Sequence, residues 1–127
     1  MHKKQSILIV DDDESCRLLL KHYLSDLDLT LFETNSGKSS IQICHKQRLN
    51  IIILDIQMPA MNGLEAVNKI RNINSWYQNI PILALTATNN IEESSTAEKY
   101  GFTECLIKPI KKEILQEKIC HYTNHIF

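Results

Sequence analysis

Acidic, hydroxyl and ammonium side chains follow the apolar segments of this 127-residue chain, and together they are suited to binding a divalent cation and a phosphate. Four acids at residues 11–14 come directly after the aliphatic run at residues 7–10, and Asp55, Thr86 and Lys108 each follow a later apolar segment. Carboxylates packed together repel one another unless a divalent cation compensates their charge. Mg²⁺ suits such a set because it prefers carboxylate, carbonyl and phosphate oxygens, and no thiolate or imidazole array is present for zinc.

Phosphoryl transfer to a carboxylate is the reaction that these residue types favour. It needs an aligned nucleophile and cations that stabilise the charge on the transferred group. Asp55 is the candidate nucleophile, because a carboxylate is ionised at neutral pH and aspartyl phosphates are established covalent intermediates. Lys108 would place a positive charge on the phosphate, and Thr86 would donate a hydrogen bond to one of its oxygens.

The same residues also have structural interpretations. Asp13 and Glu14 stand where a helix is expected to begin, and capping and the helix dipole favour acids there, so a structural role is the stronger interpretation for both. Asp11, Asp12 and Asp55, each taken alone, could equally be ordinary loop residues. The functional interpretation therefore depends on a fold that brings these side chains together.

Short aliphatic runs predict strands that are covered on both faces, as in a parallel sheet. Three such runs occur, at residues 7–10, 51–54 and 82–85, and weaker strands are predicted at residues 29–34 and 103–107. Segments with the apolar spacing of amphipathic helices separate and follow them. These helices are predicted over residues 16–27, 36–47, 63–74, 89–100 and 111–122.

Strand and helix thus alternate five times, which predicts an α/β fold with a doubly wound, five-stranded parallel sheet and helices on both faces. In such a sheet ligands bind at the carboxyl ends of the strands, so the acids, the hydroxyl and the ammonium should converge on one edge. The helix over residues 89–100 has few large apolar side chains and is predicted to be weakly anchored.

The composition is that of a globular domain, with 43% hydrophobic and 23% charged residues. The length is close to the ~150 residues of a typical domain, so we expect one domain over residues 1–127 and no effector or DNA-binding domain. A net charge of −1 gives no electrostatic reason for binding nucleic acid or a membrane surface, and a protein partner is expected. The run at residues 7–10 is too short for a signal peptide or a membrane span, which predicts a cytoplasmic location.

The four cysteines are scattered, without a CxxC pair or zinc-finger spacing to histidine. We expect them to be reduced and mostly buried. They are Cys16, Cys44, Cys105 and Cys120.

Taken together, these motifs resemble the receiver domain of response regulators in two-component signalling, over nearly the whole chain and in the family's order. The resemblance lies in residues 7–13, 54–59, 61–63, 85–87 and 108–109, which read ILIVDDD, LDIQMP, MNG, LTA and KP. It implies a flavodoxin-like fold with strand order 2-1-3-4-5. It also implies that a histidine kinase or a histidine phosphotransfer protein phosphorylates Asp55, and that the phosphorylated form switches binding to a downstream protein target. A monomer or weak dimer would be typical.

The resemblance assigns the metal ligands residue by residue. Asp12 would be the main acidic ligand of Mg²⁺, for which Mn²⁺ could substitute, and Asp11 would support it. Asp55 and the backbone carbonyl of Gln57 would complete the protein ligands. Thr86 and Lys108 would keep the roles described above.

Other matching positions imply roles beside the phosphoacceptor. Gln57 and Thr88 would flank the approach of water and so set the rate of dephosphorylation. Pro59 and Gly63 would shape the loop after the third strand, where glycine permits backbone conformations barred to other residues. Ala87 would leave an open route to the phosphoacceptor.

The chain departs from the family's pattern at Cys105. The family usually has an aromatic residue three positions before the lysine, and its ring moves inward when the threonine moves toward the phosphate. In this chain the coupling between the threonine and the residue at position 105 is weak, or another element replaces it, or the signal passes through the helix at residues 89–100. Tyr100 is a conceivable substitute, although packing in the core is its more expected role. We expect phosphorylation to shift the loop after Thr86 and this helix, because few apolar side chains anchor them.

Two rival functions are considered. The first is a receiver-like interaction module that is not phosphorylated, against which the full set of Asp12, Asp55, Thr86 and Lys108 argues. The second is a phosphatase acting on small substrates, but such enzymes commonly use a second acid two residues after the nucleophile, and that residue is Gln57. We therefore expect no enzymatic activity beyond assistance to the domain's own phosphorylation and dephosphorylation. Residues 83–87 and 108–110 further resemble receivers attached to hybrid kinases.

Overall fold

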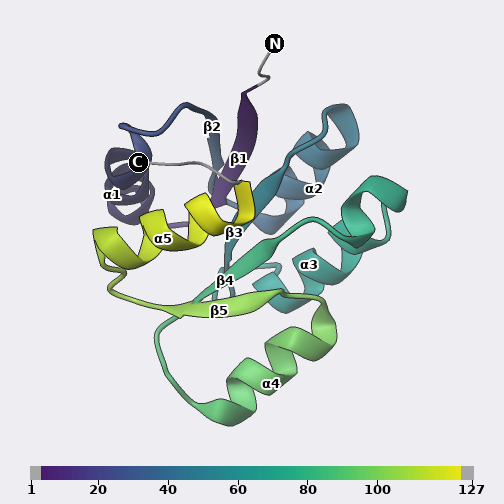
Figure 1. The fold of residues 1–127 in the computed structure, drawn as a ribbon. Helices are drawn as coiled ribbons and strands as arrows, with labels where there is room; N and C mark the ends of the chain where they lie inside the picture. Colours follow the sequence, from purple (N-terminus) through teal and green to yellow (C-terminus); the bar gives the residue numbers. More distant parts are fainter. Residues whose placement is uncertain (1–3, 124–127) are drawn as a thin grey trace.

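All five predicted strands and all five predicted α-helices are present in the structure, a computed structural model that describes residues 4–123 (Figure 1). In chain order the elements are β1 (Gln5–Val10), α1 (Glu14–Leu24), β2 (Leu29–Thr34), α2 (Gly37–Lys46), β3 (Ile51–Asp55), α3 (Gly63–Arg71), the short 3₁₀ helix η1 (Ser75–Gln78), β4 (Ile82–Thr86), α4 (Ile91–Tyr100), β5 (Glu104–Ile107) and α5 (Lys112–Thr123).

The strands form one parallel sheet in the order β2-β1-β3-β4-β5, as predicted. Every residue of β3 and β4 is buried, which explains why both strands are aliphatic up to their last residues, Asp55 and Thr86. β1 lies between β2 and β3, so its carboxyl end is next to that of β3. The acids that follow β1 therefore lie beside the acid that closes β3.

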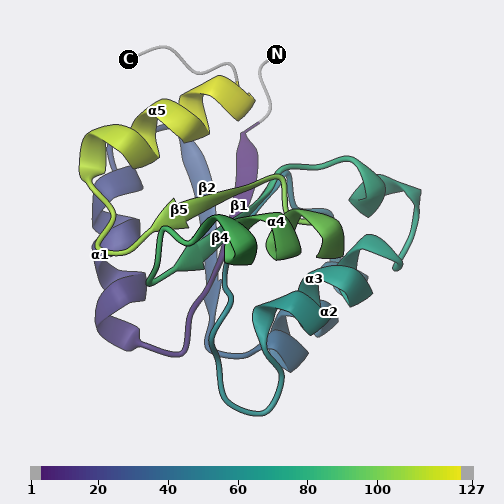
Figure 2. The ribbon, with the colours of Figure 1, turned by 90° about the horizontal axis from the view of Figure 1, so that it is seen from below.

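Helices cover both faces of the sheet (Figures 1 and 2). Ile7 and Ile9 of β1 pack in one apolar cluster with residues of α1 and α5. Leu8 and Val10 point to the other face and pack in a second cluster with residues of α2, α3 and α4. Alternate residues of the aliphatic runs thus serve opposite cores, as the period of a β-strand requires.

α4 is the α-helix with the fewest buried side chains, as its sequence predicts. Ala97 is its one buried residue, and Ile91 at its first position is 81% exposed. Tyr100 at its last position is 45% exposed, so the expectation that Tyr100 packs in the core is wrong. A helix anchored through one small side chain is expected to open locally at low cost in free energy.

The connection between α3 and β4 differs from the prediction. α3 ends at Arg71 instead of continuing to residue 74, and η1 follows, with the Asn74 side chain accepting a hydrogen bond from Tyr77 N at 3.3 Å. The Trp76 indole N–H donates to Leu49 O at 2.8 Å, and the Arg48 guanidinium lies 5.1 Å from the Trp76 ring centroid. Trp76 therefore anchors this loop.

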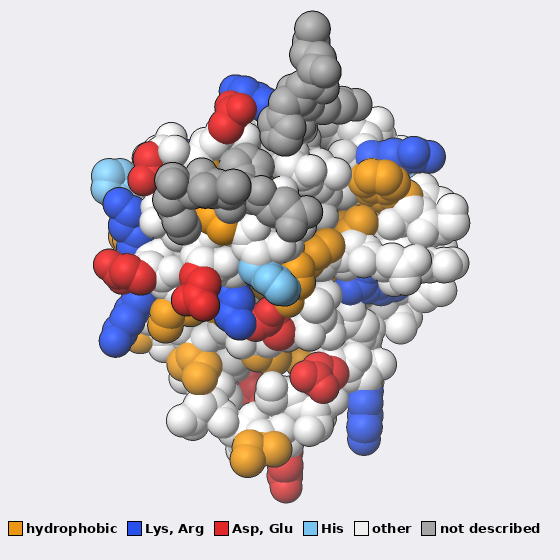
Figure 3. Space-filling view, in the orientation of Figure 1, with side chains coloured by type: hydrophobic (Ala, Val, Ile, Leu, Met, Phe, Trp, Pro, Cys, Tyr) orange, Lys and Arg blue, Asp and Glu red, His pale blue; other side chains and the backbone are white. Residues whose placement is uncertain are grey.

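All four cysteines are free thiols, as predicted, but Cys44 alone is buried and the other three are half-buried. On the face seen in Figure 3, basic and acidic side chains are interspersed over the described residues, and charge of one sign does not dominate. None of the helices in residues 4–123 combines the length and the apolar character needed to cross a membrane.

Candidate functional site

The carboxyl edge of the sheet brings together three of the predicted acids. Asp11, Asp12 and Asp55 each offer a carboxylate oxygen, and these three atoms lie within 4.8 Å of one another. Asp11 and Asp55 are 0% and 5% exposed, whereas Asp12 is exposed to solvent. Three oxygens at this spacing suit a hard divalent cation that also keeps water ligands, so the donor set fits Mg²⁺.

Lys108 compensates the charge of the two buried acids. Its Nζ lies 2.9 Å from Asp11 Oδ2 and 3.1 Å from Asp55 Oδ2, and its side chain is 28% exposed. Burial disfavours the ammonium, but the two carboxylates outweigh burial and hold the pKa of Lys108 above its usual range. Lys108 therefore stays charged at neutral pH.

The two buried carboxylates respond differently to the same site. Burial, together with the charge of Asp11, raises the pKa of Asp55 above its usual range, although Lys108 opposes this change. Burial also acts on Asp11, but hydrogen bonds from Cys16, Lys108 and the Asp13 backbone outweigh it and lower its pKa. Asp11 is thus the firmly ionised member of the pair, and Asp55 has the less stabilised negative charge.

Local interactions at the start of α1 hold Asp11 in place. Its Oδ1 accepts a hydrogen bond from Asp13 N at 2.9 Å, and its backbone carbonyl accepts one from Arg17 Nη1 at 2.7 Å. The Asp13 side chain caps α1 by accepting from Ser15 N at 2.9 Å, which confirms its structural interpretation. Arg17 Nε also bonds Glu33 at 2.9 Å, so it ties the acidic loop to β2.

The loop after β3 orients Asp55 through close backbone packing. Gln57 N donates to Asp55 Oδ1 at 3.1 Å, and Gly63 N donates to Ile56 O at 2.7 Å. A Cβ at Gly63 would lie 2.4 Å from Asp55 O and 2.7 Å from the Ile56 Cα. Glycine is needed here for this approach of two backbones, and not for the conformational freedom that the sequence suggested.

Thr86 closes β4 and is 4% exposed, but its hydroxyl bonds to a residue of α4. Thr86 Oγ1 lies 2.7 Å from Glu93 Oε1, to which it donates, and accepts from Thr88 N at 3.3 Å. Cys105 lies on β5, half-buried, where burial raises the pKa of its thiol and a hydrogen bond from Ser94 opposes that change. Neighbouring residues of α4, Glu93 and Ser94, therefore contact the two predicted switch positions.

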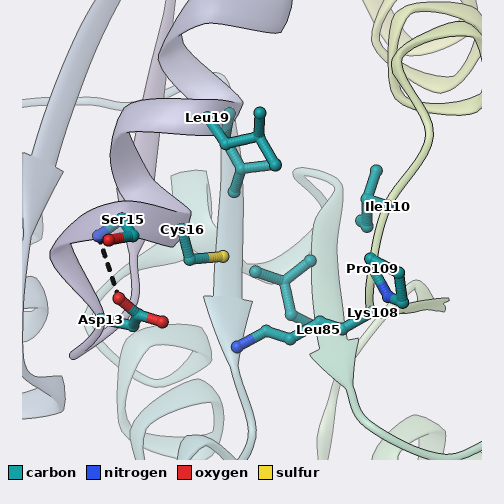
Figure 4. Close-up of a pocket in the computed structure, with 9 residues that line it drawn as sticks. Asp13, Ser15, Cys16, Leu19, Leu85, Lys108, Pro109 and Ile110 are labelled. Carbon is teal, nitrogen blue, oxygen red and sulfur yellow. Dashed lines mark hydrogen bonds between the residues drawn. The ribbon is translucent and has the colours of Figure 1, made fainter.

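A cavity of about 370 Å³ lies beside the acidic cluster, between the start of α1 and the segment after β5. In Figure 4, Cys16 and Leu19 of α1 face Leu85, Pro109 and Ile110 across it. Lys108 also lines the cavity. Burial and the neighbouring carboxylate of Asp11 raise the pKa of Cys16 to about 12, so this thiol stays protonated and donates to Asp11.

Sequence reasoning missed three residues that organise this site. Cys16 and Arg17 contact Asp11, and Glu93 contacts Thr86. The helical spacing put Cys16 on the apolar stripe of α1, which accounts for its position but not for its hydrogen bond. Glu93 sits within a polar run whose only sequence signal was its scarcity of apolar residues.

The fold and this edge of acids define a receiver domain, and comparisons with known proteins agree. The response regulator receiver domain model matches residues 7–120. The chain therefore belongs to the response regulator receiver domain family. It is 34% identical over 126 residues to the sensor protein EvgS of Escherichia coli K12, a match that covers 98% of this chain and 10% of EvgS.

Solved structures show the same fold. The chemotaxis response regulator CheY4 of Vibrio cholerae matches with a TM-score of 0.88 and 31% identity, over 94% of this chain and 99% of CheY4. The receiver domain of Ssk1 from Saccharomyces cerevisiae, solved with the histidine phosphotransfer protein Ypd1, matches with a TM-score of 0.87 and 25% identity, over 96% of this chain and 90% of that one. This chain spans less than half the length of the curated relatives compared.

Proposed function

We propose that Asp55 accepts a phosphoryl group from the phosphohistidine of a histidine kinase or a histidine phosphotransfer protein, in a reaction that depends on Mg²⁺. The observation that carries this function is the meeting of Asp55 with Asp11 and Asp12 within 4.8 Å, with Lys108 Nζ 3.1 Å from the Asp55 carboxylate. A nucleophilic oxygen, a cation site and an ammonium are the parts that phosphoryl transfer needs.

In this reaction an oxygen of Asp55 attacks the phosphorus atom. The P–O bond forms as the P–N bond breaks, and the electron pair of the broken bond returns to the imidazole nitrogen of the donor. Lys108 stabilises negative charge on the phosphoryl oxygens, and the Thr86 hydroxyl donates to one of them after the transfer.

Asp11, Asp12, Asp55 and the backbone carbonyl of Gln57 would hold the cation. When bound, Mg²⁺ supplies positive charge that offsets the charges of the carboxylates and of the transferred group. Mn²⁺ would substitute for it, because the same oxygen ligands suit both ions. Lys108 keeps its role in the presence of the metal, since two buried carboxylates and a phosphoryl group exceed the charge of one divalent ion.

The partners follow from the same chemistry. The Ssk1 receiver was solved with a histidine phosphotransfer protein, which supports a partner of that kind for this domain. Leu19 lines the cavity beside Lys108 and is 41% exposed, so it offers such a donor an apolar contact next to the site. The phosphorylated state would then change binding to a downstream protein target.

The remaining properties belong to the same proposal. The domain would act in the cytoplasm as a monomer or weak dimer, and would bind proteins in preference to nucleic acid or membranes. Gln57 and Thr88, which flank the site in sequence, would set the lifetime of the aspartyl phosphate. An acid two residues beyond Asp55 is lacking, so turnover of free phosphate esters is not part of the function.

Acetyl phosphate provides the direct test. Incubation with acetyl phosphate and Mg²⁺, followed by intact mass measurement, should add the mass of one phosphoryl group. Asp55→Asn should abolish the gain, as should a chelator in place of Mg²⁺. Asp13→Asn is the matched control. It keeps a side-chain oxygen that can cap α1, and Asp13 is not one of the proposed Mg²⁺ ligands, so this variant should retain the gain in mass. An unmodified wild-type mass under these conditions would favour the rival function, a receiver-like interaction module that is not phosphorylated.

A further inference from the structure

The Thr86 hydroxyl has one proton, and two acceptors lie within reach of it: the Glu93 carboxylate of α4 at 2.7 Å and the Thr88 carbonyl oxygen at 3.3 Å. The shorter, charge-assisted bond to Glu93 is the stronger one, so Glu93 is the main acceptor in the unphosphorylated domain. Thr86 Oγ1 donates to Glu93 Oε1 at 2.7 Å, a distance typical of a strong hydrogen bond with a charged acceptor. A hydroxyl in this arrangement cannot also donate to a phosphoryl oxygen on Asp55. Glu93 and the phosphoryl group therefore compete for the same proton.

We propose that Glu93 is a positioning residue that holds Thr86 in its unphosphorylated orientation and is released when the phosphoryl group takes over the hydroxyl, a role that rests on the phosphorylation of Asp55 proposed above. Both acceptors are anionic, and one hydroxyl cannot serve both. The bond to Glu93 must break before Thr86 can stabilise the phosphoryl group. Glu93 therefore contributes to the free-energy difference between the unphosphorylated and the phosphorylated conformations.

The same bond links the phosphorylation site to α4. Glu93 lies in the first turn of α4, whose one buried residue is Ala97 near its other end. Ser94 adds a contact with Cys105 of β5. Loss of the Glu93 contact therefore removes one of few restraints on this turn, and the turn becomes freer to move.

This link takes the place of the missing aromatic residue. Cys105 has no ring that could fill a space vacated by Thr86. Its thiol instead contacts Ser94, the residue that follows Glu93 in α4. Movement of Thr86 is thus reported to α4 by a hydrogen bond and not by packing of a side chain. The output of the domain would be a change at the start of α4.

Beryllofluoride, a stable mimic of the phosphoryl group, measures the competition. With Mg²⁺ present, Glu93→Ala should lower the half-saturating beryllofluoride concentration by about three- to tenfold, because the mimic no longer has to displace a charge-assisted hydrogen bond. Glu93→Gln keeps a neutral acceptor oxygen and should have an intermediate effect. Glu92→Ala removes the same charge from an exposed neighbour that does not contact Thr86, and should leave the concentration unchanged.

The dependence on Thr86 separates competition from a general charge effect. In a Thr86→Ala background, Glu93→Ala should change nothing further, whereas in a Thr86→Ser background, which retains a hydroxyl, its effect should persist. Equal effects of Glu92→Ala and Glu93→Ala would overturn the proposal. So would an effect of Glu93→Ala that survives in Thr86→Ala.

Amide exchange without any phosphoryl mimic tests the contact independently of phosphorylation. Glu93→Ala and Thr86→Ala should each speed exchange in the first turn of α4, and the double variant should add nothing, because both remove one bond. If wild-type protein took up neither phosphate nor beryllofluoride, the proposed function would fail while this measurement still decided whether Glu93 restrains α4. Additive effects of the two substitutions would show that it does not.

Discussion

Lys108 Nζ lies 3.1 Å from Asp55 Oδ2, and this ion pair joins the segment after β5 to the end of β3. The same ammonium lies 2.9 Å from Asp11 Oδ2, so two buried carboxylates share one cation. One positive charge cannot fully compensate two negative ones, and Asp55 is the less stabilised partner. Neutralising Asp55 and neutralising Asp11 should therefore change stability in opposite directions.

Asp55→Asn should stabilise the domain at neutral pH. The pKa of Asp55 is raised on folding, so the native state binds this proton more tightly than the unfolded chain does, and ionised Asp55 destabilises the native state. We expect a gain of about 1 kcal/mol in the free energy of unfolding at about pH 7. The gain should shrink as pH falls through the raised native pKa of Asp55, and should vanish below the ordinary Asp value of 3.8, where both states are protonated. Urea unfolding at several pH values measures it, and a gain independent of pH would contradict the assigned charge.

Asp11→Asn should have the opposite sign. The pKa of Asp11 is lowered on folding, so its ionised form stabilises the native state above the ordinary value of 3.8, and this stability is lost as pH falls through the lower native pKa. We expect a loss of about 1–3 kcal/mol in the free energy of unfolding at neutral pH. The same urea series applies. If Asp11→Asn and Asp55→Asn shifted stability in the same direction, the unequal sharing of Lys108 would be wrong.

Asp12 and Asp13 should separate metal binding from helix capping. Asp12 is exposed, so Asp12→Ala should leave the free energy of unfolding nearly unchanged and weaken Mg²⁺ affinity by roughly tenfold or more, as expected for a lost carboxylate ligand. Asp13→Ala removes the cap of α1 and should cost about 1 kcal/mol while leaving Mg²⁺ affinity intact. Mg²⁺ titration by calorimetry, with thermal melting alongside, distinguishes the two. Equal loss of Mg²⁺ affinity in both variants would remove Asp12 as a specific ligand.

Gly63→Ala should disrupt the loop after β3. The added Cβ would lie 2.4 Å from Asp55 O, a backbone atom, so the loop or the end of β3 must shift. We expect a loss of about 2–3 kcal/mol or more in the free energy of unfolding and slower phosphorylation of the displaced Asp55. Gly37→Ala is the matched control, because the nearest atoms to its Cβ belong to side chains, Met61 at 3.1 Å and Ala66 at 3.2 Å, and not to the backbone. A Gly63 variant as stable as the Gly37 variant would show that the backbone contact matters little.

Phosphorylation should loosen α4 more than any other helix. Ala97 is its one buried residue, and Thr86 releases Glu93 when it turns to the phosphoryl group. We expect amide exchange over residues 88–96 to quicken on addition of beryllofluoride and Mg²⁺, while α3, which buries Ala66, Val67 and Ile70, keeps its protection. Unchanged exchange in α4, in a sample where changed exchange at other amides of the site shows that beryllofluoride is bound, would mean that another element transmits the signal.

Local pattern was sufficient to predict the fold, because each strand and helix carries its own periodic signal. Aliphatic runs such as Ile51 to Leu54 are buried on both faces, so their consecutive apolar residues are enough to predict a buried strand. The predicted ends of the elements were less accurate. α3 ends at Arg71, three residues before the predicted end, and the Arg71 guanidinium donates hydrogen bonds to the carbonyls of Tyr77, Ile80 and Gly101 in other parts of the chain. Such contacts leave no local pattern.

The sequence by itself determined the α/β fold, the family and the set of acids that should meet, because residues at the carboxyl ends of parallel strands share one edge whatever the side-chain details. The tertiary structure alone decided how these groups divide their charge and their hydrogen bonds. The positions of Lys108 between Asp11 and Asp55, of Gly63 against Asp55 O, and of Glu93 beside Thr86 depend on distances between segments far apart in the chain or on the orientation of a helix. Those distances arise from packing, which residue type and spacing do not encode.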